Sequence, residues 1–84
     1  MKIKVELFGA SREFSKNNVI EFEIRNNSTI KDIREEMMSY LDQNFSGNQD
    51  FKKIVNSSAF CNESNNIVSD NYKITKDEKI AIIP

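Results

Sequence analysis

The chain has 84 residues, 38% of them hydrophobic and 30% charged, with only two glycines and one proline. This length and composition exclude a disordered segment and a chain of several domains, and they predict one globular domain over residues 1–84. Twelve basic and thirteen acidic residues leave a formal net charge of −1, so there is no basic excess for binding nucleic acid or an acidic membrane surface.

The first two elements are predicted to be strands. In residues 2–8 and again in residues 18–25, apolar and polar side chains alternate, which is typical of a strand with one buried face. The connection between them, GASREFSKN, is long for a tight hairpin but can join neighbouring strands. The buried faces are expected to carry Ile3, Val5 and Leu7 in the first strand and Ile20, Phe22 and Ile24 in the second.

The next segment, STIKDIREEMMSYLDQ, has the pattern of a helix. Thr29 and Asp32 have the spacing of a capping box, which predicts that the helix begins there. Gly47, within the turn formers NFSGNQD, is expected to take the left-handed conformation that ends the helix. Apolar side chains follow at spacings of three and four, so one face of the helix is expected to carry Ile30, Ile33, Met37 and Leu41.

The second half of the chain is predicted to contain two or three strands. Residues 51–55, FKKIV, are interpreted as a strand, and residues 57–71 as a short strand followed by a long loop rich in Asn and Ser. The final segment, KIAIIP, is apolar on both faces. It is expected to be a strand in the middle of a sheet, or one whose outer face meets a partner.

The order of these elements predicts the topology. If the first and last strands pair, they run parallel, because the helix supplies the crossover that a parallel pair requires. The expected fold is therefore α+β: a mixed sheet with one main helix packed across one face, which is the β-grasp, or ubiquitin-like, roll.

The sequence lacks residue types that catalysis and metal binding commonly use. It contains no histidine, the commonest general base and a common metal ligand, and Cys61 is its only cysteine. The sequence therefore predicts no metal, no cofactor, no intramolecular disulfide and no catalysis by the chain alone. A lone cysteine and the absence of a secretion signal in MKIKVELFGA favour a cytoplasmic location.

Three small groups of residues are candidate sites. Glu21 and Glu23 share a strand face, but a solvated face is a better interpretation than paired catalytic carboxylates. Cys61 is interpreted as a loop thiol. Arg12 and Glu13 could form a surface ion pair worth at most about 1 kcal/mol.

Two apolar residues point to an interaction surface. If the end strands are parallel neighbours, Phe8 and Ile83 both project from the sheet face that lies away from the helix, near Ala81. Exposed apolar patches of this kind usually mark interaction sites. The alternative is that the loop containing Phe60 folds over them.

Several segments, in the right order over nearly the whole chain, resemble the small subunit of molybdopterin synthase, in the ubiquitin-like sulfur-carrier family. They are IKVELFGASREF, STIKDIREEM, the pair Val55-Asn56, and ITKDEKIAIIP, with an insertion within residues 60–71. Val55-Asn56 would fall in the third strand of that family. The carriers of the thiamine pathway resemble the chain less, because they lack the features that match REF and IIP.

The resemblance implies a non-catalytic carrier. In that family an ATP-dependent, E1-like enzyme adenylates a C-terminal glycine, which is converted to a thiocarboxylate. The tail then enters the large synthase subunit and donates its sulfur to a pterin precursor of the molybdenum cofactor. A glycine tail suits this task because it carries no side chains. The residues expected to meet these two partners are Phe8, Arg12, Ala59, Phe60, Ala81, Ile83 and Pro84.

The sequence departs from the family pattern in two places. Asp77 replaces a turn glycine, which is tolerable if Asp77 adopts the left-handed conformation. No Gly-Gly pair follows Pro84, so the sulfur-accepting glycine is not present in this chain. Two interpretations remain open: a carrier whose tail lies beyond Pro84, or a ubiquitin-like binding module without sulfur chemistry. We expect the first, because KIAIIP keeps the lead-in to the tail.

Overall fold

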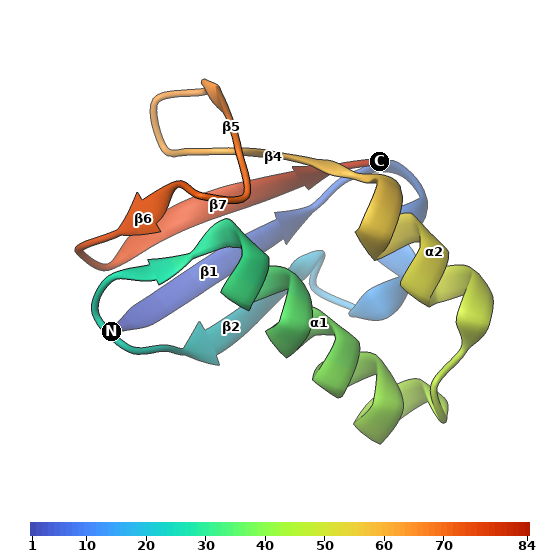
Figure 1. Cartoon of the computed structure of the whole chain (residues 1–84). Coiled ribbons are helices and arrows are strands. Elements are labelled where there is room, and N and C mark those ends of the chain that lie inside the picture. Colours follow the sequence, from blue (N-terminus) through green and yellow to red (C-terminus); the bar gives the residue numbers. More distant parts are fainter.

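A computed structural model describes all 84 residues of the chain (Figure 1). It contains a five-stranded sheet, a second sheet of two short strands, two α-helices and one 3-10 helix, η1. In chain order the elements are β1 (Lys2–Leu7), η1 (Gly9–Phe14), β2 (Val19–Glu23), β3 (Ser28–Thr29), α1 (Ile30–Phe45), α2 (Gln49–Ser57), β4 (Ala59–Cys61), β5 (Ile67–Val68), β6 (Lys73–Ile74) and β7 (Glu78–Ile83).

The main sheet has the strand order β2-β1-β7-β4-β5, so the first and last strands of the chain are neighbours near its centre. β1 runs antiparallel to β2 and parallel to β7, and β4 pairs antiparallel with β7. The helix α1 lies across one face (Figure 1). This arrangement is the β-grasp roll, and it confirms the predicted mixed sheet with a parallel central pair.

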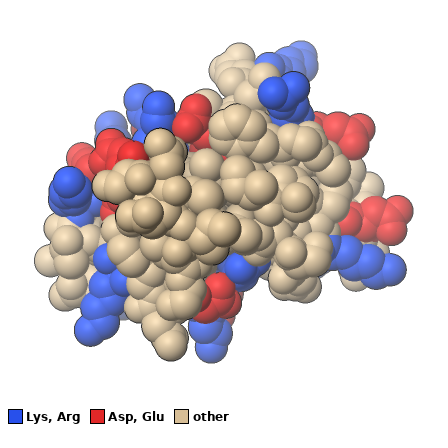
Figure 2. Space-filling view, turned by 90° about the horizontal axis from the view of Figure 1, so that it is seen from above, with Lys and Arg blue, Asp and Glu red and all other residues tan.

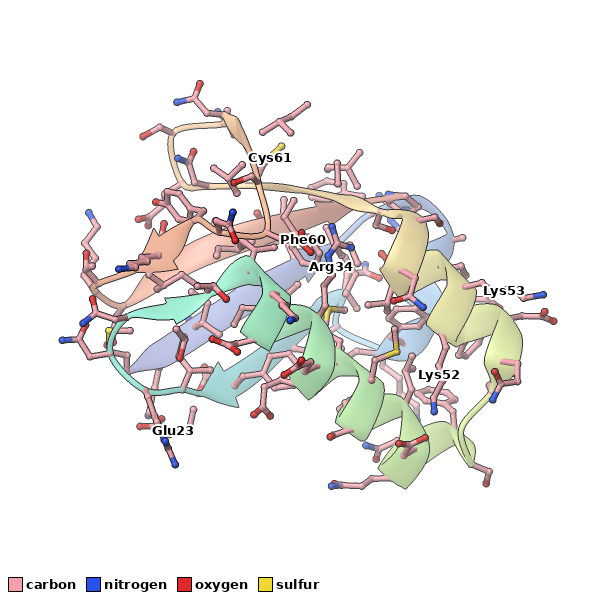
Figure 3. All side chains as sticks on the ribbon, in the orientation of Figure 1. Glu23, Arg34, Lys52, Lys53, Phe60 and Cys61 are labelled. Atoms are coloured by element: carbon pink, nitrogen blue, oxygen red, sulfur yellow. The ribbon has the colours of Figure 1, made fainter.

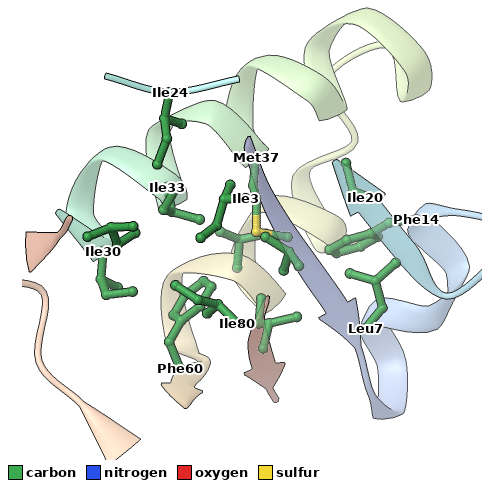
Figure 4. Close-up of a cluster of buried hydrophobic side chains, with 14 of the residues drawn as sticks. Ile3, Leu7, Phe14, Ile20, Ile24, Ile30, Ile33, Met37, Phe60 and Ile80 are labelled. Carbon is green, nitrogen blue, oxygen red and sulfur yellow. The ribbon is translucent and has the colours of Figure 1, made fainter. Parts of the chain in front are cut away.

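The core lies between the sheet and the helices. Alternate residues of β1 and β7 point toward α1 and are almost fully buried, as the period-two pattern predicts. The apolar face of α1 meets them (Figure 4). The fifteen core residues are Ile3, Val5, Leu7, Phe14, Ile20, Ile24, Ile30, Ile33, Met37, Leu41, Val55, Phe60, Ile74, Ile80 and Ile82.

The helix α1 begins at the predicted capping box. The Thr29 hydroxyl accepts a hydrogen bond from the Asp32 backbone N–H at 3.4 Å, and the Asp32 carboxylate accepts one from the Thr29 N–H at 2.9 Å. At the other end Ser46 and Gly47 both have positive φ, of 52° and 69°. The helix therefore ends at Phe45, with Ser46 as its left-handed C-cap, and Gly47 takes the predicted left-handed conformation next to it.

We expect the substitution Thr29→Ala to lower the free energy of unfolding by about 1 kcal/mol, because it removes the side chain that satisfies a free N–H at the start of the helix. Chemical denaturation measures this loss. Thr75→Ala is the matched control, since Thr75 is exposed and makes no side-chain hydrogen bond. Equal stability of the two variants would contradict a capping role for Thr29.

The prediction of a strand at residues 51–55 is wrong: these residues belong to α2. The Asn48 side chain accepts a hydrogen bond from the Phe51 N–H at 3.1 Å and so caps the helix. Phe51 packs against Phe14 and Phe45, with ring centroids 5.1 and 5.2 Å apart. The segment is too short for periodicity alone to separate a strand from a helix, and this packing decides in favour of the helix.

The long connections contain more structure than expected. Residues 9–14 form η1, and the predicted loop after β4 turns back as the short strand β5, which pairs with β4. β3 and β6 pair with each other in the second sheet. None of these elements has the length that periodicity can detect.

Candidate functional site

The sheet face turned away from α1 carries a row of apolar residues at the carboxyl end of β1. Leu7 pairs with Ile82, so the next residues along these parallel strands, Phe8 and Ile83, are neighbours on the outer face. Ile83 in turn lies opposite Ala59 of β4. Phe8 is 39% exposed and Ile83 is 40% exposed, so no other part of the chain covers them.

A second apolar row lies beside the first. Ala81 pairs with Cys61, and Cys61 pairs with Ile67 of β5, so these three side chains share the outer face. Ile67 is 75% exposed, the highest value for any large apolar residue in the chain. Together the two rows form a surface that we call the outer apolar surface: Phe8, Ala59, Cys61, Ile67, Ala81 and Ile83.

The space-filling view from above shows a broad area without charged side chains, with the Lys, Arg, Asp and Glu residues at its rim (Figure 2). This view looks down on the part of the molecule that carries β4 and β5 in Figure 1. An uncharged centre with a charged rim is the layout of many protein–protein interfaces.

Local contacts fix both ends of the first row. The buried Ser11 donates a hydrogen bond from its hydroxyl to the Phe8 carbonyl at 2.6 Å, which holds the chain as it leaves β1 and enters η1. Gly9 follows with a φ of +55°, a conformation that favours glycine. A Cβ at Gly9 would lie 3.6 Å from the Pro84 ring, so Pro84 packs against this turn beside Phe8.

Of the seven residues expected to meet a partner, the structure brings four together in the outer apolar surface: Phe8, Ala59, Ala81 and Ile83. Pro84 lies at its margin and is exposed. Arg12 is exposed on η1 and makes no ion pair, either with Glu13 or with any other residue. The surface also contains two residues that were not predicted to belong to it, Cys61 and Ile67.

Phe60 is the exception, because its side chain is fully buried in the core. It lies opposite Ile82 on the inner face of the sheet, so it neither contributes to the outer apolar surface nor covers Phe8 and Ile83. Figure 3 shows Phe60 and Arg34 beside each other on the helix side of β4. Two neighbours in a strand point to opposite faces, so Phe60 lies on the inner face when Ala59 lies on the outer one.

Arg34 is a residue whose role the sequence did not indicate. Its guanidinium lies 4.7 Å from the centre of the Phe60 ring, donates to the Asp70 carboxylate at 3.0 Å and donates to the Val55 carbonyl at 2.5 Å. These contacts join α1 to the end of α2, to β4 and to the turn before β6. Arg34 therefore positions, from behind, the strand that carries Ala59 and Cys61.

The remaining candidate residues show no catalytic arrangement. Glu21 and Glu23 are exposed on β2, opposite Lys4 and Lys2 of β1, as expected for a solvated face. Cys61 lies in a strand rather than a loop and is half-buried. No three His, Cys, Asp or Glu side chains form a group that could hold a metal ion, and no helix is long and apolar enough to cross a membrane.

The expected conformation of Asp77 is wrong in detail. Asp77 is not among the residues with positive φ. Its carboxylate instead accepts a hydrogen bond from the Lys2 N–H at 3.0 Å. An aspartate in this turn therefore ties the beginning of β1 to the beginning of β7, which a glycine could not do.

Comparisons with known proteins identify the fold. No protein-family model matches the chain, and no curated protein matches it in sequence. Among solved structures it is similar to molybdopterin converting factor, subunit 1, from Pyrococcus furiosus, with a TM-score of 0.67, 14% identity, and coverage of 99% of this chain and 95% of that one. It is also similar to SAMP1 from Haloferax volcanii, with a TM-score of 0.70, 11% identity, and coverage of 100% and 94%. At these identities the likeness shows a shared β-grasp fold.

Proposed function

We propose that the chain is a sulfur carrier, the small subunit of molybdopterin synthase, and that it is non-catalytic by itself. The observation that carries this proposal is the outer apolar surface, which lies where β7 ends at Pro84. The partners are the large synthase subunit and an ATP-dependent adenylating enzyme. The resemblance of the sequence segments and the name of the Pyrococcus furiosus neighbour support this choice of pathway.

The position of the surface suits a carrier that must bind its partner and present its C-terminal tail to that partner at the same time. β7 is held on both sides, by β1 and by β4, so its end is rigid. A flexible tail leaving Pro84 would begin at the margin of the outer apolar surface. A partner bound to Phe8, Ala59, Ala81 and Ile83 would therefore hold the start of the tail at a fixed place, with Arg12 and Pro84 at the rim of the contact.

The proposal requires a tail ending in Gly-Gly beyond Pro84. The adenylating enzyme joins the terminal carboxylate of that tail to AMP, and pyrophosphate leaves from ATP. A sulfide-level sulfur donor then attacks the acyl carbon and displaces AMP, which leaves the thiocarboxylate. The domain supplies binding energy and position. Phe60 contributes only from within the core, where it supports β4.

Titration calorimetry tests the choice of partner. The full chain is mixed separately with the large subunit of molybdopterin synthase, with its adenylating enzyme and with the thiazole synthase of the thiamine pathway. We expect binding to the first two with Kd values of about 1 μM, or −8 kcal/mol. Binding to the thiazole synthase alone would assign the chain to the thiamine pathway. A failure to bind any of the three would contradict the carrier proposal and favour a binding module without sulfur chemistry.

A further inference from the structure

The strand β2 leaves one row of backbone hydrogen-bonding groups unpaired. It is the edge strand of the sheet, with β1 on one side and no strand on the other (Figure 1). The Asn18 carbonyl accepts from Leu7 at 2.8 Å, and Ile24 exchanges two backbone bonds with Met1. Since the pairing alternates along an antiparallel strand, Val19, Glu21 and Glu23 direct their N–H and C=O groups away from β1.

An acidic hollow borders this free edge on the helix side. It has a volume of about 540 Å³ and is lined by residues of β2, of the following turn and of the first turns of α1. Its charged residues are four acids and one base: Glu23, Asp32, Glu35, Glu36 and Arg25. Glu23 projects from the end of β2 (Figure 3), and its ion pair is with the N-terminal ammonium at 3.6 Å.

On the outer face the charges of β2 have partners on one side only. Glu21 and Glu23 lie opposite Lys4 and Lys2 of β1. On the other side of β2 no strand follows, and Arg25 is the one basic residue beside the four acids of the hollow. A strand added there with basic side chains would continue the alternation of charges across the sheet.

We propose that the free edge of β2 binds an extended basic segment of a partner protein, which adds to the sheet as a further strand. The free N–H and C=O groups of Val19, Glu21 and Glu23 would supply the hydrogen bonds of the new ladder. Side chains on one face of the segment would lie beside Glu21 and Glu23, and those on the other face would enter the acidic hollow beside Glu35 and Glu36.

The charges also decide against a second copy of this chain as the occupant. Pairing two β2 edges would bring Glu21 and Glu23 of one copy beside the same residues of the other, which is repulsive. The edge lies at the opposite end of the sheet from β4 and β5, which carry Ala59, Cys61 and Ile67 of the outer apolar surface. The basic segment could therefore be bound while that surface is occupied, and the inference does not depend on the proposed function.

Nuclear magnetic resonance with a defined probe tests the proposal. The probe is a capped heptapeptide of alternating lysine and valine, titrated into the full chain labelled with nitrogen-15. We expect saturable shifts centred on the backbone amides of Val19, Glu21 and Glu23. The same peptide, N-methylated at the amides that face β2, should bind at least about tenfold more weakly, because it keeps the charge but cannot form the ladder.

A charge-reversal pair tests the acidic hollow. Glu36→Lys should weaken binding of the probe about fivefold, which corresponds to the upper range for an exposed ion pair. Asp50→Lys changes the net charge equally at the exposed start of α2, outside β2 and the acidic hollow, and should leave binding unchanged. The proposal is overturned if the probe does not bind, if the N-methylated or a glutamate–valine peptide binds equally well, or if the shifts lie on β4 and β5. Self-association through β2 without peptide would overturn it as well.

Discussion

The substitution Ile83→Asp should abolish binding to the large synthase subunit while the domain stays folded. Ile83 lies at the centre of the first apolar row, between Phe8 and Ala59, and 40% of it is exposed. An aspartate there would place an unpaired charge in the interface. We expect the Kd to rise by roughly a hundredfold or more, or about 3 kcal/mol, in the calorimetric titration.

The fold of this variant should lose only about 1 kcal/mol, because the side chain is already partly in water. Ser39→Asp is a suitable control for the added charge, since Ser39 is exposed on α1, away from the outer face of the sheet. A collapsed Ile83→Asp variant would mean that Ile83 belongs to the core. A folded variant that still binds with full affinity would remove the outer apolar surface from the proposal.

The second large effect concerns Phe60. We expect Phe60→Ala to lower the free energy of unfolding by about 3–5 kcal/mol, because it leaves a cavity under β4 and removes the ring on which the Arg34 guanidinium rests. For a domain of this size such a loss approaches the total stability. Urea denaturation of the two proteins gives the difference.

Phe8→Ala is the matched control, because it removes the same side chain from an exposed position. It should change stability by less than about 1 kcal/mol but weaken binding to the large subunit. The pair thus separates a core aromatic residue from a docking one. If Phe8→Ala proved the more destabilising of the two, the assignment of the inner and outer faces would be wrong.

The sequence predicted β1, β2 and β7 of the main sheet well because their apolar residues follow clear strand patterns. β1 and β2 show the alternation clearly, and the two-sided apolar pattern of KIAIIP indicated the central position of β7. The capping box located the beginning of α1 to the residue. In each case the local pattern and the tertiary environment favour the same structure.

Two predictions failed because contacts between distant parts of the chain determine the structure at those positions. α2 is short, and it is held by an Asn48 cap and by an aromatic cluster formed with Phe14 and Phe45, residues from distant parts of the chain. The resemblance had placed Val55 and Asn56 in a strand, whereas both lie in this helix. Phe60 was assigned to the surface because nothing in its local sequence shows which face of a three-residue strand is buried.

The sequence predicted where the candidate site lies but not all of the residues that form it. The topology alone set Phe8 beside Ile83, since parallel neighbours at the centre of the sheet share an outer face. Cys61 and Ile67 join them only because the predicted loop turns back into β5 and pairs with β4. Arg34, which holds β4 from behind, became recognisable only once α1, α2 and β4 were assembled.

The intact mass of the protein purified from its natural host tests the central claim most directly. The carrier proposal predicts a mass above that of the 84-residue chain by a short tail ending in Gly-Gly, with a fraction heavier by the exchange of one oxygen for sulfur. A mass equal to the 84-residue chain, with no sulfur-bearing fraction, would contradict it. The β-grasp domain would then be a binding module that uses its outer apolar surface without carrying sulfur.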